Sequence, residues 1–126
     1  MSKIYVEKLP IPKISSEKQQ PFINLVDYIL FGKENKLKLQ TAYFEQLIDG
    51  LVFELYFADE IAAANKPIFK HLGELKPITN TLTTEEKRTL IQSEFDRLYD
   101  PSHPVRNHLE TLDSVEEVRI IKEALQ

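Results

Sequence analysis

The sequence predicts an all-α fold, a helical bundle built on a long antiparallel helix hairpin, with a short extended N-terminal arm. Two long segments, residues 16–31 and 41–65, carry apolar side chains at three- and four-residue spacing, which is typical of helices with one buried face. A short polar link at residues 33–38 joins them, and such a link favours an antiparallel hairpin. The chain contains only three glycines, which suits helices and argues against a nucleotide-binding loop.

The composition predicts one cytoplasmic globular domain. A chain of 126 residues can bury a sizeable core, and its hydrophobic (42%) and charged (29%) contents lie near globular averages. The absence of cysteine excludes disulfides, thiolate zinc sites and cysteine nucleophiles, and it fits a reducing compartment. No apolar run approaches the roughly 20 residues of a membrane span, and the N-terminus lacks a signal-peptide core. We therefore expect no membrane contact.

Residues 1–14 are predicted to form an extended arm. The segment alternates around Ile4 and Val6 and then reaches Pro10 and Pro12, which cannot donate to a sheet ladder. A single strand of this kind has little to pack against in a helical chain. We therefore expect the arm to be the end of an upstream region in a larger polypeptide, and residues 15–126 to form a helical domain.

The first helix is predicted over residues 16–31. Ser15 or Ser16 offers its N-cap, and Pro21 is expected to kink its entry. Its buried stripe is predicted to consist of Phe22, Leu25, Val26 and Ile29.

The central helix, residues 41–65, is predicted to have one buried stripe and an opposite polar arc. The predicted stripe consists of Phe44, Leu47, Ile48, Leu51, Val52, Leu55 and Tyr56. The opposite arc carries acidic and amide side chains, which we expect to be solvated: Glu45, Gln46, Asp49 and Glu54.

Gly50, Phe53 and Phe57 interrupt this polar arc. Glycine inside a helix costs roughly 1 kcal/mol relative to alanine, so Gly50 predicts the close approach of another element. Phe53 and Phe57 lie one helical turn apart and have two interpretations. They either pack within the chain, as aromatic residues at helical spacing usually do, or form a partner surface such as a homodimer interface. A free-standing helical interaction or dimerisation module is accordingly the alternative function.

Shorter elements are predicted after the central helix. A short helix near residues 68–72 is expected to end at Gly73, and residues 76–82 are expected to form a loop. Thr83 and Glu86 have the spacing of a capping box and predict a helix that continues to about residue 99.

The C-terminal part is predicted to hold two more helices. One covers about residues 102–112 with Pro104 in its first turn, and Asp113 or Ser114 caps the last one. The short helix near residue 68 is suggested by Ile68, Phe69 and Leu72. The inward-facing residues predicted for the later helices are Leu90, Ile91, Phe95, Leu98, Val105, Leu109, Leu112, Val115, Val118, Ile121 and Leu125.

The residues themselves carry no catalytic or metal-binding signature. His71, His103 and His108 are the only histidines, and none forms a His-Glu-x-x-His or comparable ligand pair. Acidic pairs such as Asp59–Glu60 fall at helix starts or on polar faces, where solvation and the helix dipole favour them. We therefore predict no catalytic residue and no metal site.

The basic residues offer one candidate binding region. Residues 1–38 have a net charge of +3, residues 39–65 of −5 and the remainder of −2. The chain as a whole thus lacks the net basic character of a free-standing nucleic-acid binder. The candidates for phosphate contact are Lys33, Lys36 and Lys38 at the hairpin tip and Lys8 and Lys13 in the arm. The alternative interpretation is that these lysines are simply solvated.

Several phrases resemble a known family. These are Pro10-Ile11-Pro12, Ser15, Gln19-Gln20, Val26-Asp27 and Ile29-Leu30, then Ile48-Asp49 and Leu55-Tyr56, then residues 103–106 (His-Pro-Val-Arg) and 114–121 (Ser-Val-Glu-Glu-Val-Arg-Ile-Ile). In this order they look like the C-terminal helical region of adenine-specific DNA methyltransferases, especially the fused type IIG restriction-modification enzymes. The resemblance spans nearly the whole chain.

The resemblance implies a role in bacterial DNA restriction and modification. The complete enzymes transfer a methyl group from S-adenosylmethionine to the amino group of adenine. This chain lacks the glycine-rich cofactor loop, the Asn-Pro-Pro-Tyr or Asp-Pro-Pro-Tyr tetrapeptide and a nuclease motif. The expectation is therefore a non-catalytic C-terminal domain, without a cofactor of its own, that supports target recognition. Its partners would be DNA and the upstream methyltransferase and target-recognition domains of the parent enzyme.

Overall fold

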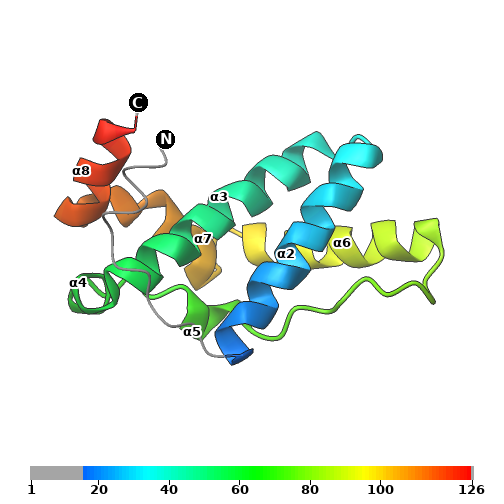
Figure 1. Cartoon of the computed structure of the whole chain (residues 1–126), viewed down its shortest axis with the longest axis horizontal. Coiled ribbons are helices and arrows are strands. Elements are labelled where there is room, and N and C mark those ends of the chain that lie inside the picture. Colours follow the sequence, from blue (N-terminus) through cyan, green and yellow to red (C-terminus); the bar gives the residue numbers. More distant parts are fainter. Residues whose placement is uncertain (1–15, 126) are drawn as a thin grey trace.

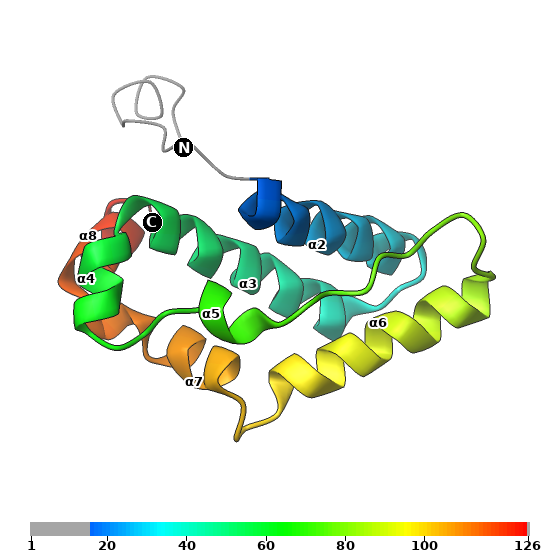
Figure 2. The ribbon, with the colours of Figure 1, turned by 90° about the horizontal axis from the view of Figure 1, so that it is seen from below.

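The computed structural model describes residues 16–125, and every regular element in that part of the chain is helical. Helix α2 (Ser16–Glu34) and helix α3 (Lys38–Tyr56) run in opposite directions from a tight turn at residues 35–37 and contact one another (Figures 1 and 2). The predicted antiparallel hairpin is thereby confirmed. The later elements are α4 (Ala58–Ala63), α5 (Phe69–Leu72), α6 (Thr84–Tyr99), α7 (Pro104–Glu110), the 3-10 helix η1 (Leu112–Ser114) and α8 (Glu116–Ala124).

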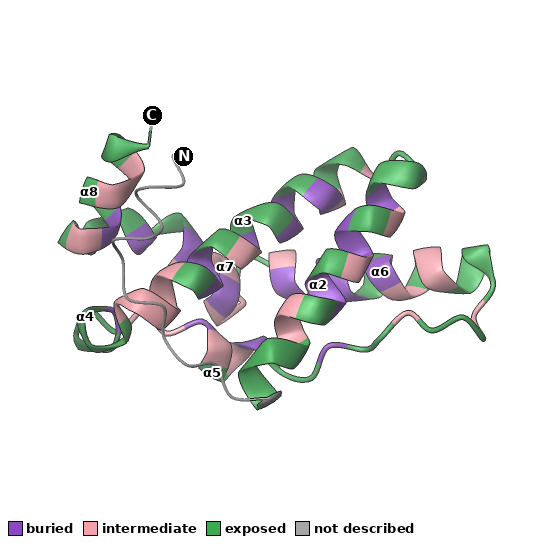
Figure 3. Cartoon of the chain, in the orientation of Figure 1, coloured by how far each residue is buried: buried purple, intermediate pink, exposed green. Residues whose placement is uncertain are grey.

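The remaining helices complete the bundle around α3. Figure 2 shows α6 running along the hairpin, while α4, α7 and α8 gather at the other end of α3. Buried positions lie on the helix faces that turn toward one another (Figure 3). None of the helices between residues 16 and 125 is long and apolar enough to cross a membrane.

An aromatic cluster joins the hairpin to α6. Phe44 is fully buried, and its ring centroid lies 5.4 Å from that of Tyr28 on α2 and 6.2 Å from that of Phe95 on α6. Tyr43 continues the cluster with an edge contact to Tyr99 at 4.9 Å and donates its hydroxyl to the Leu98 carbonyl at 2.7 Å. The rings of three helices therefore meet in one core.

The inner face of α2 differs from the predicted stripe. Leu25 and Ile29 are buried as expected, but Val26 is 44% exposed, so that part of the prediction is wrong. Asn24 and Tyr28 face inward instead, because their side chains donate to the carbonyl oxygens of residues 75 and 76. These hydrogen bonds satisfy both polar groups inside the fold. With Asn24 and Tyr28 on the inner face of α2, Val26 lies on its outer face.

The central helix is shorter than predicted. Helix α3 ends at Tyr56, and Phe57 adopts a non-helical conformation (φ −124°, ψ 45°) before α4 begins. The bend turns the chain so that Ile61 on α4 is fully buried. The prediction of one continuous helix over residues 41–65 is therefore wrong.

Two residues of the central helix have other surroundings than predicted. Val52 is 37% exposed, whereas the prediction placed it in the buried stripe. Glu54 was expected to be solvated, but its Oε1 accepts hydrogen bonds from the backbone N–H groups of Ile68 (2.7 Å) and Phe69 (3.0 Å). It thereby caps the start of α5 from across the fold, as carboxylates favour helix N-termini.

Gly50 marks the close approach that its presence in a helix predicts. A Cβ at this position would lie 2.5 Å from Leu109 Cδ2 and 2.9 Å from Ile68 Cδ1. Glycine therefore lets α7 and the residue before α5 pack directly against the backbone of α3.

The local signals in the second half are confirmed at three helix ends. Helix α5 closes at Gly73, whose φ of 72° is left-handed. Thr83 and Glu86 form the predicted capping box, with Thr83 Oγ1 accepting from the Glu86 N–H at 3.1 Å. Helix α7 begins at Pro104, preceded by His103, whose Nδ1 accepts from the Val105 N–H at 3.1 Å.

The cap predicted for the last helix is wrong. Helix α8 starts after Val115, which makes no side-chain cap, because residues 112–114 form η1 instead. The carboxylate of Asp113 pairs with Lys122 Nζ at 2.6 Å. Val115 is buried, which explains why an apolar residue occupies the cap position, whereas Leu125 is 49% exposed and does not face inward as predicted.

The end of α5 and the extended segment that follows it are held by side chains of two helices. From α2, Asn24 Nδ2 donates to the Leu75 carbonyl at 3.1 Å and the Tyr28 hydroxyl donates to that of Lys76. From α6, Arg97 Nη1 donates to the Leu72 carbonyl at 2.9 Å. Arg97 also neutralises the buried Glu94 carboxylate at 2.9 Å. We refer to these interactions as the loop clamp.

Candidate functional site

The turn between α2 and α3 brings the three predicted tip lysines together. Lys33 lies in the last turn of α2, Lys36 in the connecting turn and Lys38 at the first position of α3. All three line one surface hollow of about 320 Å³, which we call the tip hollow. The sequence-predicted cluster therefore exists as a single surface feature.

The backbone of the turn fixes where these lysines lie. The N–H of Leu37 donates to the Gly32 carbonyl at 2.8 Å, and the N–H of Asn35 donates to that of Phe31 at 3.0 Å. Lys36 has a φ of 61°, a left-handed conformation that reverses the chain. A Cβ on Gly32 would lie 2.3 Å from Thr41 Oγ1, so any larger residue at this position would force the Thr41 side chain to move.

The cations of the hairpin tip are paired only weakly or not at all with other described residues. Lys33 Nζ lies 3.4 Å from Glu45 Oε1, but both side chains are more than half exposed, so this ion pair is weak. Neither Lys36 nor Lys38 takes part in an ion pair with another described residue. On α6, Arg88 Nη2 reaches the Asn35 side-chain oxygen at 3.5 Å and brings a fourth cation beside the turn, but this cation is paired with Glu85, whose Oε1 lies 3.8 Å from Arg88 Nε.

Comparison of the chain with protein-family models, with curated proteins and with solved structures finds no match. The nature of the site therefore has to be inferred from its residues.

The other predicted site residues do not line the tip hollow. Lys8 and Lys13, the arm itself and its boundary at residue 14 lie outside the described part of the chain. Gly50 is buried inside the fold. Phe53 is half-buried, with Lys122 Nζ 5.8 Å from its ring centroid, and Phe57 is half-buried at the bend after α3. A partner surface at these two rings stays a prediction.

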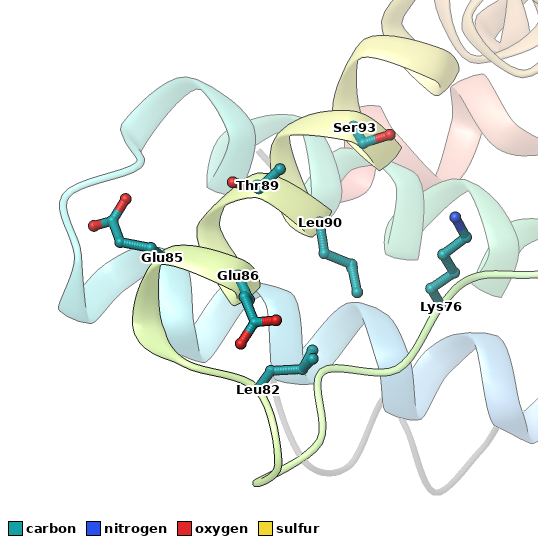
Figure 4. Close-up of a pocket in the computed structure, with 7 residues that line it drawn as sticks. All are labelled: Lys76, Leu82, Glu85, Glu86, Thr89, Leu90 and Ser93. Atoms are coloured by element: carbon teal, nitrogen blue, oxygen red, sulfur yellow. The ribbon is translucent and has the colours of Figure 1, made fainter.

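A second, open hollow of about 490 Å³ lies along α6 (Figure 4). The carboxylates of Glu85 and Glu86 lie toward one end and the Lys76 ammonium at the other, with apolar Leu90 between them. Glu86 is engaged in the capping box, and its hydrogen bonds to Thr83 lower the pKa of its carboxyl. No acid and base converge in this hollow on a point where a substrate could be held.

The histidines lie close together, which sequence reasoning missed. The rings of His71 on α5 and His108 on α7 make an edge contact with their centroids 5.3 Å apart. His108 Nδ1 lies 2.6 Å from the Pro67 carbonyl oxygen. Within residues 16–125, no group of three or more His, Asp or Glu side chains is arranged to hold a metal ion. Only the docking of α5 on α7 creates this cluster, so no local signal could have found it.

Stability is expected to fall as the pH drops below about 6.5, the ordinary pKa of histidine. Partial burial and the positive charges of Arg97 and His71 lower the pKa of His103, and Asp100 offsets this only in part. The unfolded chain therefore binds more protons than the folded chain in the window between about 6.5 and the lowered pKa. Protonation of Nδ1 also removes the acceptor that caps α7. Thermal unfolding between pH 7.5 and 5 measures this loss.

The variant His103→Asn is the matched control for this titration. Asparagine is a good N-cap but carries no ionisable group, and the variant keeps every other side chain of the protein. The melting temperature of His103→Asn should therefore decline less over this pH range than that of the unchanged protein. Parallel pH profiles for the two proteins would contradict the assignment to His103.

Proposed function

We propose that this chain is the C-terminal helical domain of a bacterial DNA adenine N6-methyltransferase or type IIG restriction-modification enzyme, and that it holds DNA by the phosphate backbone. The domain is non-catalytic by itself. S-adenosylmethionine and the methyl transfer belong to other parts of the parent enzyme, which acts in the cytoplasm. The observation that supports DNA contact is the convergence of Lys33, Lys36 and Lys38 on the tip hollow.

Lysine side chains at such a tip contact phosphates without reading bases. Backbone contacts of this kind fix the position of a protein on the duplex, whereas sequence is read by groups that reach the base edges. The net charge of −4 and the acidic stretch at residues 39–65 limit attraction to the basic end of the molecule. We therefore expect weak binding that is strongly weakened by salt.

The test is the salt dependence of DNA binding by a triple variant of the tip lysines. Fluorescence anisotropy of a labelled duplex is measured over a salt series for the unchanged chain and for Lys33→Gln/Lys36→Gln/Lys38→Gln. Each phosphate contact contributes about 0.9 to the slope of log K against log salt, so the slope should fall by about 2 to 3 in magnitude. At low salt the affinity should fall roughly tenfold or more.

The matched control removes three lysines from other places. Lys66, Lys70 and Lys76 lie in the segment from α4 to the loop before α6, away from the hairpin tip (Figure 1). Their replacement by glutamine changes the net charge equally but should leave the slope nearly unchanged. Equal effects of the two triple variants would show that binding is not localised at the tip.

The parent enzyme is tested separately in genomic DNA. An open reading frame that continues upstream in frame and encodes an Asn-Pro-Pro-Tyr tetrapeptide and a cofactor-binding region supports the proposal. Methyl transfer to DNA by these 126 residues alone would overturn it.

A further inference from the structure

Helix α2 carries an apolar stripe on its outer side. Ile23, Val26 and Leu30 are 51%, 44% and 58% exposed, and their spacing of three and four residues places them on one line along the helix. The buried residues Leu25 and Ile29 occupy another side of the same helix, toward the core. The described chain therefore leaves the stripe largely open to solvent.

The exposed apolar surface continues from α2 onto α3. Lys33 follows Leu30 on the same line of α2, and its Nζ lies 3.4 Å from Glu45 Oε1 on α3. Val52 lies two turns after Glu45 on the same side of α3 and is 37% exposed. Because the two helices run antiparallel (Figure 2), this geometry places Val52 alongside the first half of α2. Apolar side chains that are grouped on a surface, unlike single ones, indicate an interaction site. We call this surface the hairpin face: Ile23, Val26, Leu30 and Val52.

Acidic side chains border the hairpin face. Glu45 and Asp49 lie one turn apart on this side of α3, and both are exposed. Asp27 lies beside the stripe on α2 and is half-buried. Residues 39–65 as a whole contain five acidic residues and neither lysine nor arginine. The hairpin face therefore suits a partner that combines apolar side chains with basic ones.

The sequence of residues 1–15 has this combination. The segment lies outside the described part of the chain and joins α2 directly at Ser16. It contains three lysines and one glutamate, which give it a net charge of +2. Pro10 and Pro12 have no N–H donor, so this part needs fewer hydrogen-bond partners than an ordinary strand when it packs on an apolar helix. Its aliphatic residues recur at every second or third position: Ile4, Val6, Leu9, Ile11 and Ile14.

The length of this segment also fits the distance that it has to cover. A helix rises about 1.5 Å per residue, so Ile23 lies roughly 10 Å and Val26 roughly 15 Å along α2 from Ser16. An extended chain covers about 3.3 Å per residue. After a turn of about two residues, Ile11 therefore comes level with Ile23. Leu9 comes level with Val26 in the same way.

We infer that residues 1–15 of the same chain dock on the hairpin face, with Leu9 and Ile11 against the stripe of α2. The lysines of the segment then lie near the acidic side chains that border the face. The inference goes beyond the proposed function, because it concerns a surface of the domain other than the tip hollow and does not depend on DNA binding. It gives the N-terminal arm a packing partner within the helical chain, which the sequence did not reveal.

The first experiment traps the docked segment with a disulfide. The chain contains no cysteine, so the full chain with Leu9→Cys/Val26→Cys has only the two introduced thiols. In dilute solution with a mild oxidant, this pair should form an intramolecular disulfide about ten times faster than Leu9→Cys/Ser93→Cys, because docking raises the effective concentration of one thiol at the other. Ser93 is exposed on α6 and serves as the control position. Equal rates for the two pairs would overturn the inference. A disulfide that joins two chains would also overturn it, since a second copy would then occupy the hairpin face.

The second experiment leaves the arm itself unchanged and measures its cleavage by trypsin after Lys8 and Lys13. Val26→Asp places a charge in the apolar contact and should accelerate both cleavages about tenfold, because proteolysis follows the population of the open form. Leu39→Asp is the matched control, since Leu39 is 58% exposed at the opposite end of α3 from Val52. Both replaced side chains are exposed, so the helical fold should persist in each variant, which circular dichroism checks. Equal cleavage rates in the two variants would contradict docking of the arm on this face.

Discussion

Replacing Phe44 by alanine should lower the free energy of unfolding by about 3–5 kcal/mol, the usual cost of emptying a buried aromatic site. The Phe44 ring is fully buried and contacts Tyr28 on α2 and Phe95 on α6. Its removal therefore leaves a cavity at the point where the hairpin meets α6 and also loses favourable ring contacts. Equilibrium unfolding in urea, followed by far-ultraviolet circular dichroism, measures the change.

Leu39→Ala is the matched control on the same helix. Leu39 is 58% exposed, so its truncation should change the free energy of unfolding by no more than about 0.5 kcal/mol. If Phe44→Ala were as mild as this control, the aromatic cluster would not be the core that connects the three helices.

Replacing Gly50 by leucine should destabilise the fold by about 3 kcal/mol, the upper end of the usual cost of overpacking. A side chain at this position has to displace Leu109 on α7 and Ile68 before α5, which already lie within 2.9 Å of a new Cβ. Both neighbours are fully or almost fully buried and have little room to move. Urea unfolding gives the magnitude.

Ala42→Leu adds a comparable side chain to the exposed face of α3. Its stability should stay within about 0.5 kcal/mol of the unchanged protein. Gly50→Ala should lie between the two, because the gain in helix propensity, about 1 kcal/mol, offsets part of the steric cost. A Gly50→Leu protein as stable as Ala42→Leu would show that α7 does not pack against the backbone of α3.

Several helix ends followed from local signals in the sequence, although the cap predicted at residues 113–114 is wrong. The capping box at Thr83, Pro104 at the start of α7 and Gly73 at the end of α5 each act through residues within one turn, so a short stretch of sequence contains the whole interaction. The bend at Phe57 has no such signal, because neither glycine nor proline occurs there. Its cause is tertiary, since the bend brings Ile61 into the core.

Which face of a helix is buried was harder to predict. Asn24 and Tyr28 turn inward because backbone carbonyls about 50 residues later accept their hydrogen bonds, and hydrophobic periodicity does not contain that information. Glu54 faces inward for a related reason, since it caps α5 from α3. On α2 and α3, polar residues that hydrogen-bond to distant backbone groups thus account for part of the difference between the predicted and the observed inner faces.

The candidate site was predictable only in part. The three tip lysines are close in sequence, so any tight turn over residues 35–37 brings them together. Thr41, Glu45 and Arg88 belong to the same region only through helix packing. The side-chain oxygen of Thr41, which forms no hydrogen bond with the described residues, lies beside Gly32 of α2 only because the two helices pack together. The positive charge of the hairpin tip could be predicted from the sequence, whereas the surroundings of Thr41 could be known only from the fold.

The loop clamp and the aromatic cluster also determine the order of events while the chain is being synthesised. The hairpin is complete at Tyr56, and two antiparallel helices can pair within microseconds to milliseconds. Phe95 follows 39 residues after Tyr56, which at translation speeds of about 5–20 residues per second is a delay of roughly 2–8 seconds. During that interval the Phe44 ring has its contact with Tyr28 but not the one with Phe95. The side-chain donors of Asn24 and Tyr28 lack their acceptors for a shorter time, until residues 75 and 76 have been made. The newly made hairpin therefore exposes its apolar inner face for seconds. A chaperone that shields this face would raise the yield of folded protein.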